Sequence, residues 1–231
     1  MKKCNRIVAI ILAVVIAVSL AACSSKSSGN GDTNVKEPTV NNADIASKAS
    51  VGDSVTLGKF DNKDITWTVV SKEDGKLFLV SDKALVNMNF GELGSASWED
   101  CSVRQWLSGT FYNDSFTDDE KAIITDTEIK DEATIGKGGT SVIDKVFVCS
   151  IEEIKNRTLE TSSNYSEAFN AKCSDMTGTA TEYWCRSIAL DSQSVINYVD
   201  TEGEWQAYYN EEAGSIANYG VRPAMWITAA E

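Results

Sequence analysis

The chain has 231 residues, with 34 Asp and Glu against 21 Lys and Arg, so its formal net charge is −13. So acidic a surface repels nucleic acid and anionic lipid alike, and we expect no nucleic-acid partner. Histidine is absent, which excludes serine–histidine and cysteine–histidine nucleophile pairs and His-ligated zinc or copper sites. The sequence also lacks a phosphate-binding loop and an EF-hand loop, so it predicts no cofactor.

The N-terminal segment has the features of an export signal. Lys2, Lys3 and Arg6 form a basic start, and the 16 residues from Ile7 to Ala22 include only one polar side chain. A membrane-spanning helix needs roughly 20 apolar residues, so this run of 16 is short for a membrane anchor. A basic start, an apolar middle and small residues before a cleavage site are typical of a secretory signal. We therefore predict a signal peptide over residues 1–22.

The residues that close this segment, Leu20-Ala21-Ala22-Cys23, resemble the lipobox of bacterial lipoproteins. The resemblance implies that Cys23 becomes the N-terminus and carries diacylglycerol, with palmitate-type chains, on its thiol. Removal of the signal leaves 18 Lys and Arg against 34 Asp and Glu, a formal charge of −16. The lipid, and not the protein surface, would therefore hold the chain at the membrane, facing outside the cytoplasm.

Residues 23–48 are rich in Ser, Asn, Gly and Asp and have almost no large apolar side chain. Such a stretch buries too little surface to offset its ordering entropy, so after Cys23 we predict a flexible tether. Residues 49–231 have the size of a single domain with a core of its own.

The first part of this domain has strand patterns. Residues 54–57 alternate, residues 65–70 are β-branched and aromatic, and residues 76–80 follow after Glu73-Asp74-Gly75. An Asp-Gly pair between two such runs is a strong hairpin signal. The last third returns to strand patterns at 182–187, 195–199 and 221–227.

The middle of the domain indicates helices. Three capping-box patterns occur, beginning at Ser97, Thr117 and Ser150. After the first, Val103, Trp106 and Leu107 share one helical face. The acids at 118–120 suit a helix start, although their oxygens are also calcium ligands. Strands, then helices, then strands predict an α+β fold with mainly antiparallel pairing.

One ordered series of motifs runs through the domain. It consists of W-T-V-V at 67–70, W-E-D-C-S-V-R-Q-W-L at 98–107, F-Y-N-D-S-F at 111–116, D-K-V-F at 144–147, S-I-E-E at 150–153, Y-W-C-R-S at 183–187 and G-V-R-P-A at 220–224. The series resembles the bacterial family numbered 6273 among domains of unknown function. That family is similar, more distantly, to the C-type lectin-like fold of formylglycine-generating enzymes. The resemblance implies a small twisted antiparallel sheet, a few short helices and long surface loops, and it implies no particular ligand.

Three arginines, Arg104, Arg186 and Arg222, lie inside these motifs. The planar guanidinium suits bidentate pairing with a carboxylate, and this acidic chain offers many. We expect the arginines to pin helix and strands around the core. The functional alternative is that they face a cleft and receive an anionic group.

Aromatic residues divide into expected core and candidate ligand contacts. The expected core residues on apolar runs are Trp67, Trp106 and Trp226. Trp184 lies beside Cys185 and Arg186, whereas Trp205 and Tyr208 lie in a polar, acidic stretch where a ring can stack on a sugar or a partner protein. The candidate ligand-binding residues are therefore Arg104, Trp184, Arg186, Trp205, Tyr208 and Arg222.

Cysteine usage leaves the disulfides open. Once Cys4 leaves with the signal and Cys23 is lipidated, the remaining cysteines are Cys101, Cys149, Cys173 and Cys185. Four cysteines in an exported protein allow three pairings, and the sequence does not choose between them. Cys149 ends a strand-like run, so we expect it to be buried.

Two classes of function fit these features. The first is a non-enzymatic binding or scaffold domain at the cell surface, with a glycan or an envelope protein as its partner. The second is a cysteine-dependent oxidase resembling the sulfatase-modifying enzymes, with copper and the pair Cys173 and Cys185. The absence of histidine and of cofactor motifs favours the first.

Overall fold

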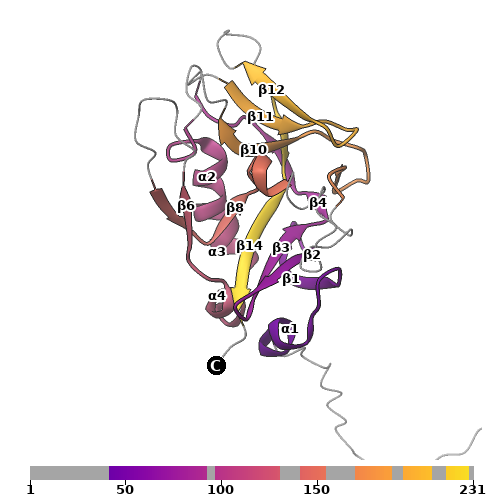
Figure 1. The fold of residues 1–231 in the computed structure, drawn as a ribbon, viewed down its shortest axis with the longest axis vertical. Coiled ribbons are helices and arrows are strands. Elements are labelled where there is room, and N and C mark those ends of the chain that lie inside the picture. Colours follow the sequence, from indigo (N-terminus) through magenta and orange to yellow (C-terminus); the bar gives the residue numbers. More distant parts are fainter. Residues whose placement is uncertain are drawn as a thin grey trace, which may run out of the picture. The chain divides into compact units, whose positions relative to one another are not determined.

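Figure 1 shows the computed structural model, which describes residues 42–92, 97–130, 141–154, 170–188, 195–209 and 217–228. The predicted signal peptide, Cys23 and the tether up to residue 41 lie outside the described residues. No helix in the described ranges is long and apolar enough to cross a membrane. Strands form most of the regular structure and the helices are short, which confirms the predicted α+β class.

The first sheet has the strand order β1-β2-β3-β14-β8, and each neighbouring pair is antiparallel. Its strands are β1 (Ser54–Phe60), β2 (Lys63–Glu73), β3 (Lys76–Ser81), β14 (Pro223–Thr228) and β8 (Val146–Val148). Asp74 and Gly75 have φ values of 48° and 77°, the left-handed conformation that a tight hairpin turn requires. The hairpin predicted from Asp74-Gly75 is therefore confirmed.

The second sheet has the order β12-β11-β10-β13-β5. Its strands are β12 (Trp205–Tyr209), β11 (Val195–Val199), β10 (Tyr183–Ile188), β13 (Tyr219–Val221) and β5 (Val86–Met88). Within this sheet β10 and β13 pair in parallel, and the other neighbouring strands pair antiparallel. Two smaller pairs join β4 (Lys83–Ala84) to β9 (Ser174–Asp175) and β6 (Thr127–Lys130) to β7 (Ser141–Asp144). Mainly antiparallel pairing is confirmed, but the strands divide into two five-stranded sheets where one small sheet was expected.

The run 221–227, predicted as one strand, is divided at Arg222. β13 ends before this residue and pairs with β10 and β5, whereas β14 begins after it and pairs with β3 and β8. Pro223 has no N–H, so the exchange of partners leaves no backbone donor unpaired at that residue. The chain therefore passes from the second sheet to the first at Arg222, and the start of β14 lies where the two sheets meet (Figure 1).

Four consecutive helical segments follow β5. They are α2 (Ser102–Trp106), the π-helical turn η1 (Leu107–Phe111), α3 (Tyr112–Ser115) and α4 (Asp118–Ile123). Thr117 caps α4 as predicted, because its hydroxyl accepts from the N–H of Glu120 while the Glu120 carboxylate accepts from the N–H of Thr117. The same reciprocal pair joins Ser150 and Glu153 ahead of the helical residues 151–154.

The capping box predicted at Ser97 is wrong. Residues 98–100 form a turn, because Trp98 is buried and donates its indole N–H to Asp144 Oδ2 at 2.8 Å. Cys101 caps α2 instead, with its Sγ accepting from the N–H of Arg104 at 3.3 Å. A tertiary contact of Trp98 thus overrides the local signal.

Helix α1 (Asn42–Lys48) lies inside the stretch predicted as flexible tether, so these residues are helical where the sequence predicts a flexible chain. Ala46 and Ala49 are buried, and Lys72 Nζ donates to the carbonyl of Ala49 at 3.2 Å. A few small apolar side chains are enough to stabilise this helix because the rest of the domain provides the surface that buries them.

One hydrophobic cluster joins the sheets and helices. Trp67 is fully buried, as predicted, and its indole N–H donates to the carbonyl of Leu57 at 2.8 Å. Val103 and Leu107 are buried on the predicted face of α2 and η1. Trp106 and Trp226 pack on the cluster while remaining partly exposed, so they lie less deeply than expected.

The close packing of Gly220 generates a stability prediction. A Cβ at this position would lie 2.6 Å from the Cβ of Ala84 and 2.9 Å from the carbonyl oxygen of Glu182. We expect Gly220→Ala to lower the free energy of unfolding by about 1–3 kcal/mol, the usual cost of overpacking. Gly109→Ala is the matched control, because nothing lies within 4 Å of its added Cβ. Urea unfolding followed by tryptophan fluorescence measures both variants, and equal midpoints would contradict the packing seen at Gly220.

Candidate functional site

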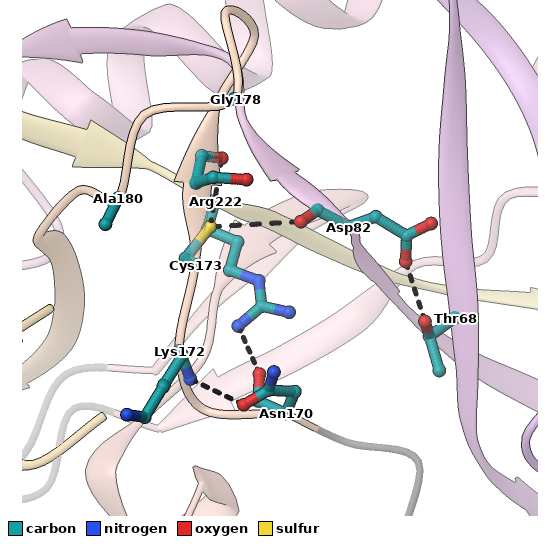
Figure 2. A pocket seen from close by; sticks show the side chains of 9 residues that line it. Thr68, Asp82, Asn170, Lys172, Cys173, Gly178, Ala180 and Arg222 are labelled. Carbon is teal, nitrogen blue, oxygen red and sulfur yellow. Dashed lines mark hydrogen bonds between the residues drawn. The ribbon is translucent and has the colours of Figure 1, made fainter. Parts of the chain in front are cut away.

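A cavity of about 370 Å³ opens beside Arg222. It is lined by Thr68, Asp82, Asn170, Lys172, Cys173, Ser174, Gly178, Ala180 and Arg222. Figure 2 shows these side chains, with that of Arg222 in their midst. Apart from Gly178 and Ala180, every lining side chain carries a polar group, so the cavity is suited to a polar ligand.

Arg222 is only 5% exposed, and neighbouring oxygens hold it in place. Its Nε donates to the carbonyl of Ser81 at 2.9 Å, and its Nη1 donates to the carbonyl of Asn170 at 2.9 Å and to the hydroxyl of Tyr183 at 3.4 Å. Burial alone would lower the pKa of Arg222, but the nearby Tyr183 phenol and Cys173 thiol outweigh it, and the pKa is raised. The guanidinium is therefore a permanent cation in the cavity wall.

The other lining groups supply hydrogen-bond acceptors and donors. Thr68 Oγ1 donates to Asp82 Oδ1 at 2.7 Å, and Lys83 Nζ donates to Ser174 Oγ. Lys172 is exposed, with its Nζ 3.0 Å from Glu202 Oε2. The cavity thus combines a carboxylate, hydroxyls and two cations.

A tight loop after β9 forms part of the cavity rim. Asp175 Oδ1 accepts from the N–H groups of Thr177 and Thr179, at 2.8 and 3.0 Å, and from the Thr177 hydroxyl at 2.6 Å. The Thr177 hydroxyl and the loop amides lower the pKa of Asp175, although partial desolvation opposes them. Gly178 has a φ of 92°, which favours glycine at the turn. The ionised carboxylate of Asp175 therefore stabilises the rim by accepting hydrogen bonds from its own loop.

Arg104 and Arg186 do not line this cavity, so the three motif arginines do not converge. Arg104 Nε donates to both carboxylate oxygens of Asp144, at 2.9 and 3.0 Å. Arg186 binds Glu153 through Nη1 at 2.5 Å and Nη2 at 2.7 Å. Both contacts are ion pairs of the structural kind that the sequence predicts. Of the three motif arginines, only Arg222 both bonds to neighbouring segments and lines a cavity.

The candidate aromatic residues occupy the second sheet. Trp184 is 1% exposed and donates its indole N–H to the carbonyl of Met88 at 2.8 Å, so its ring is not available at the surface. The ring of Tyr208 lies 5.5 Å from that of Trp184, and its hydroxyl accepts from the N–H of Ala217 at 2.9 Å. Trp205, at the start of the edge strand β12, is 50% exposed. Only Trp205 of the three presents a large aromatic surface to solvent.

The thiols of Cys101, Cys149, Cys173 and Cys185 are all buried, and none of these described cysteines is in a disulfide. Burial raises the pKa of Cys101 to about 12, and it also raises the pKa values of Cys173 and Cys185. A reactive cysteine needs an exposed setting that lowers its pKa. The described residues also contain no group of three or more His, Cys, Asp or Glu placed to hold a metal ion. The acids at 118–120 instead form the first turn of α4.

Sequence reasoning identified Arg222 but missed most of its neighbours in the cavity. Asp82, Asn170, Lys172 and Ser174 belong to none of the motifs, and each is an ordinary surface residue type. Thr68 lies in the W-T-V-V motif, whose apolar residues indicate a strand and give no reason to select the threonine as a site residue. No spacing in the sequence joins these residues, because they come from three parts of the chain, 68–82, 170–180 and 222, which are separated by about 90 and about 40 residues.

A substitution at the buried carboxylate of Asp144 can test whether Arg104 has a structural role. It accepts from Trp98 Nε1 as well as from Arg104, and its side chain is 1% exposed. We expect Asp144→Asn to lower the free energy of unfolding by about 2–4 kcal/mol, because it breaks a buried charge pair. Asp64→Asn removes the same charge from an exposed pair with Lys59 and should leave the urea midpoint unchanged. Equal effects of the two substitutions would show that the Asp144 pair has no special structural role.

The family comparison agrees with the motif series over most of the domain. The model of the family described as Domain of unknown function (DUF6273) matches residues 74–229. This range includes Asp82, the segment 170–180 and Arg222, and it begins after Thr68 and the W-T-V-V motif. Neither curated proteins nor solved structures give a match. Because the matched range covers more than half of the chain, the chain belongs to the DUF6273 family of domains of unknown function.

Proposed function

We propose that this chain is a lipid-anchored protein of the outer face of a bacterial membrane and that its folded domain binds a carbohydrate group there. The anchor rests on the N-terminal sequence, in which a basic start and an apolar run precede Leu20-Ala21-Ala22-Cys23. The mature charge of −16 supports the same reading, because an acidic surface needs lipid to stay at an anionic membrane.

The cavity beside Arg222 is the observation that carries the binding role. Sugar hydroxyls both donate and accept, so they are matched by a wall that contains both kinds of group. Asp82 provides an acceptor, Lys172 provides a donor, and Ser174 and Thr68 provide hydroxyls. The volume of about 370 Å³ lies in the range of small-ligand sites. A purely anionic ligand fits less well, because Asp82 would repel it.

The chemistry of the thiols disfavours the oxidase alternative. Cys173 and Cys185 are buried and have raised pKa values, which is the opposite of what a reactive pair needs. A binding domain requires no such group. The C-type lectin-like arrangement implied by the resemblance is part of this proposal and stays a prediction, as does the choice of a glycan over an envelope protein.

The anchor is tested by Cys23→Ser. We expect this substitution to abolish incorporation of labelled palmitate and to release the chain from the membrane fraction, because the acyl chains supply the membrane affinity. Cys4→Ser is the matched control, since Cys4 lies in the predicted signal and should leave labelling intact. Labelling that persists in Cys23→Ser would disprove the anchor without touching the binding role.

Ligand binding is tested with the mature chain on a glycan array and by co-sedimentation with purified cell-wall sacculi. We expect Lys172→Ala to weaken the binding of a retained glycan by about tenfold, the loss of one hydrogen bond from a charged donor. Lys76→Ala, which removes the same charge at a second cavity lined by Glu73 and Trp226, should have no effect. Failure of folded wild-type protein to bind any glycan, or equal effects of the two variants, would reject the carbohydrate proposal. Capture of an envelope protein in place of glycan would identify the other partner class.

A further inference from the structure

Cys149 and Cys185 lie on two segments that run side by side. Cys149 follows β8 at the edge of the first sheet, and Cys185 lies in β10 of the second. The N–H of Arg186 donates to the carbonyl of Cys149 at 3.1 Å, and the N–H of Ile151 donates to the hydroxyl of Ser187 at 2.7 Å. The first of these bonds places the backbone of Cys149 beside Arg186, the residue that follows Cys185. A disulfide requires Cα atoms about 4.4–6.8 Å apart, so it needs neighbouring backbones of this kind.

Both side chains are also buried. Cys185 is fully buried and Cys149 is 5% exposed. Alternation along β10 places Cys185 on the same face as Tyr183, whose hydroxyl contacts Arg222. Burial and then the neighbouring Cys149 are the largest causes that raise the pKa of Cys185, which agrees with adjacent thiols.

The other two thiols have different surroundings. Cys101 caps α2, where Arg104 and Asp144 are its charged neighbours. Cys173 lies in the cavity wall, with its Sγ 4.0 Å from the carbonyl of Asp82. Extended to residue 222, the registers of β14 with β3 and with β8 place Arg222 between Cys149 and Asp82, whose carbonyl Cys173 contacts.

We propose that Cys149 and Cys185 form a disulfide in the exported protein, while Cys101 and Cys173 remain thiols. The reaction is thiol–disulfide exchange with a disulfide oxidant, such as an exported oxidoreductase or oxidised glutathione. One thiolate attacks the oxidant and forms a mixed disulfide, and the second thiolate then displaces the oxidant's sulfur. The two cysteines lose two protons and two electrons, and the oxidant's disulfide is reduced to two thiols. Because both sulfurs are buried in the finished fold, exchange takes place before folding is complete.

The bond would tie the two sheets together next to Arg222. It closes the segment between residues 149 and 185, and it links the last strand of the first sheet to the central strand of the second. It uses only two of the four thiols, so it differs from each of the three full pairings that the cysteine count allows. This inference depends on the proposed function in one respect, which is that the chain is exported to an oxidising compartment. It does not depend on the identity of the ligand or on the lipid anchor.

The test is peptide mapping of the full mature chain, both isolated from bacterial membranes and refolded from guanidinium with a glutathione redox couple. Trypsin places Cys149 in peptide 146–155 but puts Cys173 and Cys185 together in peptide 173–186, so the Cys173→Ala variant is mapped in parallel. We expect 146–155 linked to 173–186 in both proteins without reductant, and iodoacetamide labelling of Cys101 only after unfolding. Iodoacetamide labelling of both Cys149 and Cys185 in the refolded, unreduced chain overturns the disulfide. A bridge that forms on refolding but is missing from cells supports the geometry and argues against export.

Unfolding curves provide a second readout. Oxidised wild-type protein and Cys101→Ser should both unfold at a higher guanidinium concentration than their reduced forms. Cys149→Ser and Cys185→Ser should show no difference between the oxidised and reduced forms. An oxidised–reduced difference that survives in either of these two variants would assign the bond to another pair.

Discussion

The burial of one guanidinium, that of Arg222, is the constraint on which the arrangement of the two sheets depends. A buried cation is costly unless its donors are satisfied, and Arg222 meets this demand by binding the carbonyls of Ser81 and Asn170 and the hydroxyl of Tyr183. These three partners belong to the end of β3, the segment before β9 and the strand β10. Arg222, at which the chain passes from one sheet to the other, therefore also links both sheets and one wall of the cavity through its hydrogen bonds.

The remaining motif arginines follow the same logic at other places. Arg104 joins α2 to the buried carboxylate of Asp144, and Arg186 joins β10 to the capping glutamate Glu153. In a chain with a net charge of −13, these cations are engaged by the fold and are not gathered at one surface. Each of these two arginines therefore links elements of the fold at its own place.

Local signals in the sequence were reliable where only neighbouring residues decide the structure. The Asp74-Gly75 hairpin and the caps at Thr117 and Ser150 form as predicted, since their hydrogen bonds close within four residues. The box at Ser97 failed because the indole of Trp98 is taken by Asp144, 46 residues further on. Likewise, α1 forms in a stretch of low hydrophobicity because the folded domain buries Ala46.

The sequence by itself determined the α+β class, the family and most strand positions, since all of these depend on residue order alone. Only the tertiary structure decided that residues 221–227 serve two sheets, that Arg222 borders a cavity, and that the backbone of Cys149 bonds to Arg186, next to Cys185. The physical reason is that strand pairing and burial are set by distant segments. Thr68, Asp82, Lys172 and Arg222 become neighbours only after the two sheets have packed together.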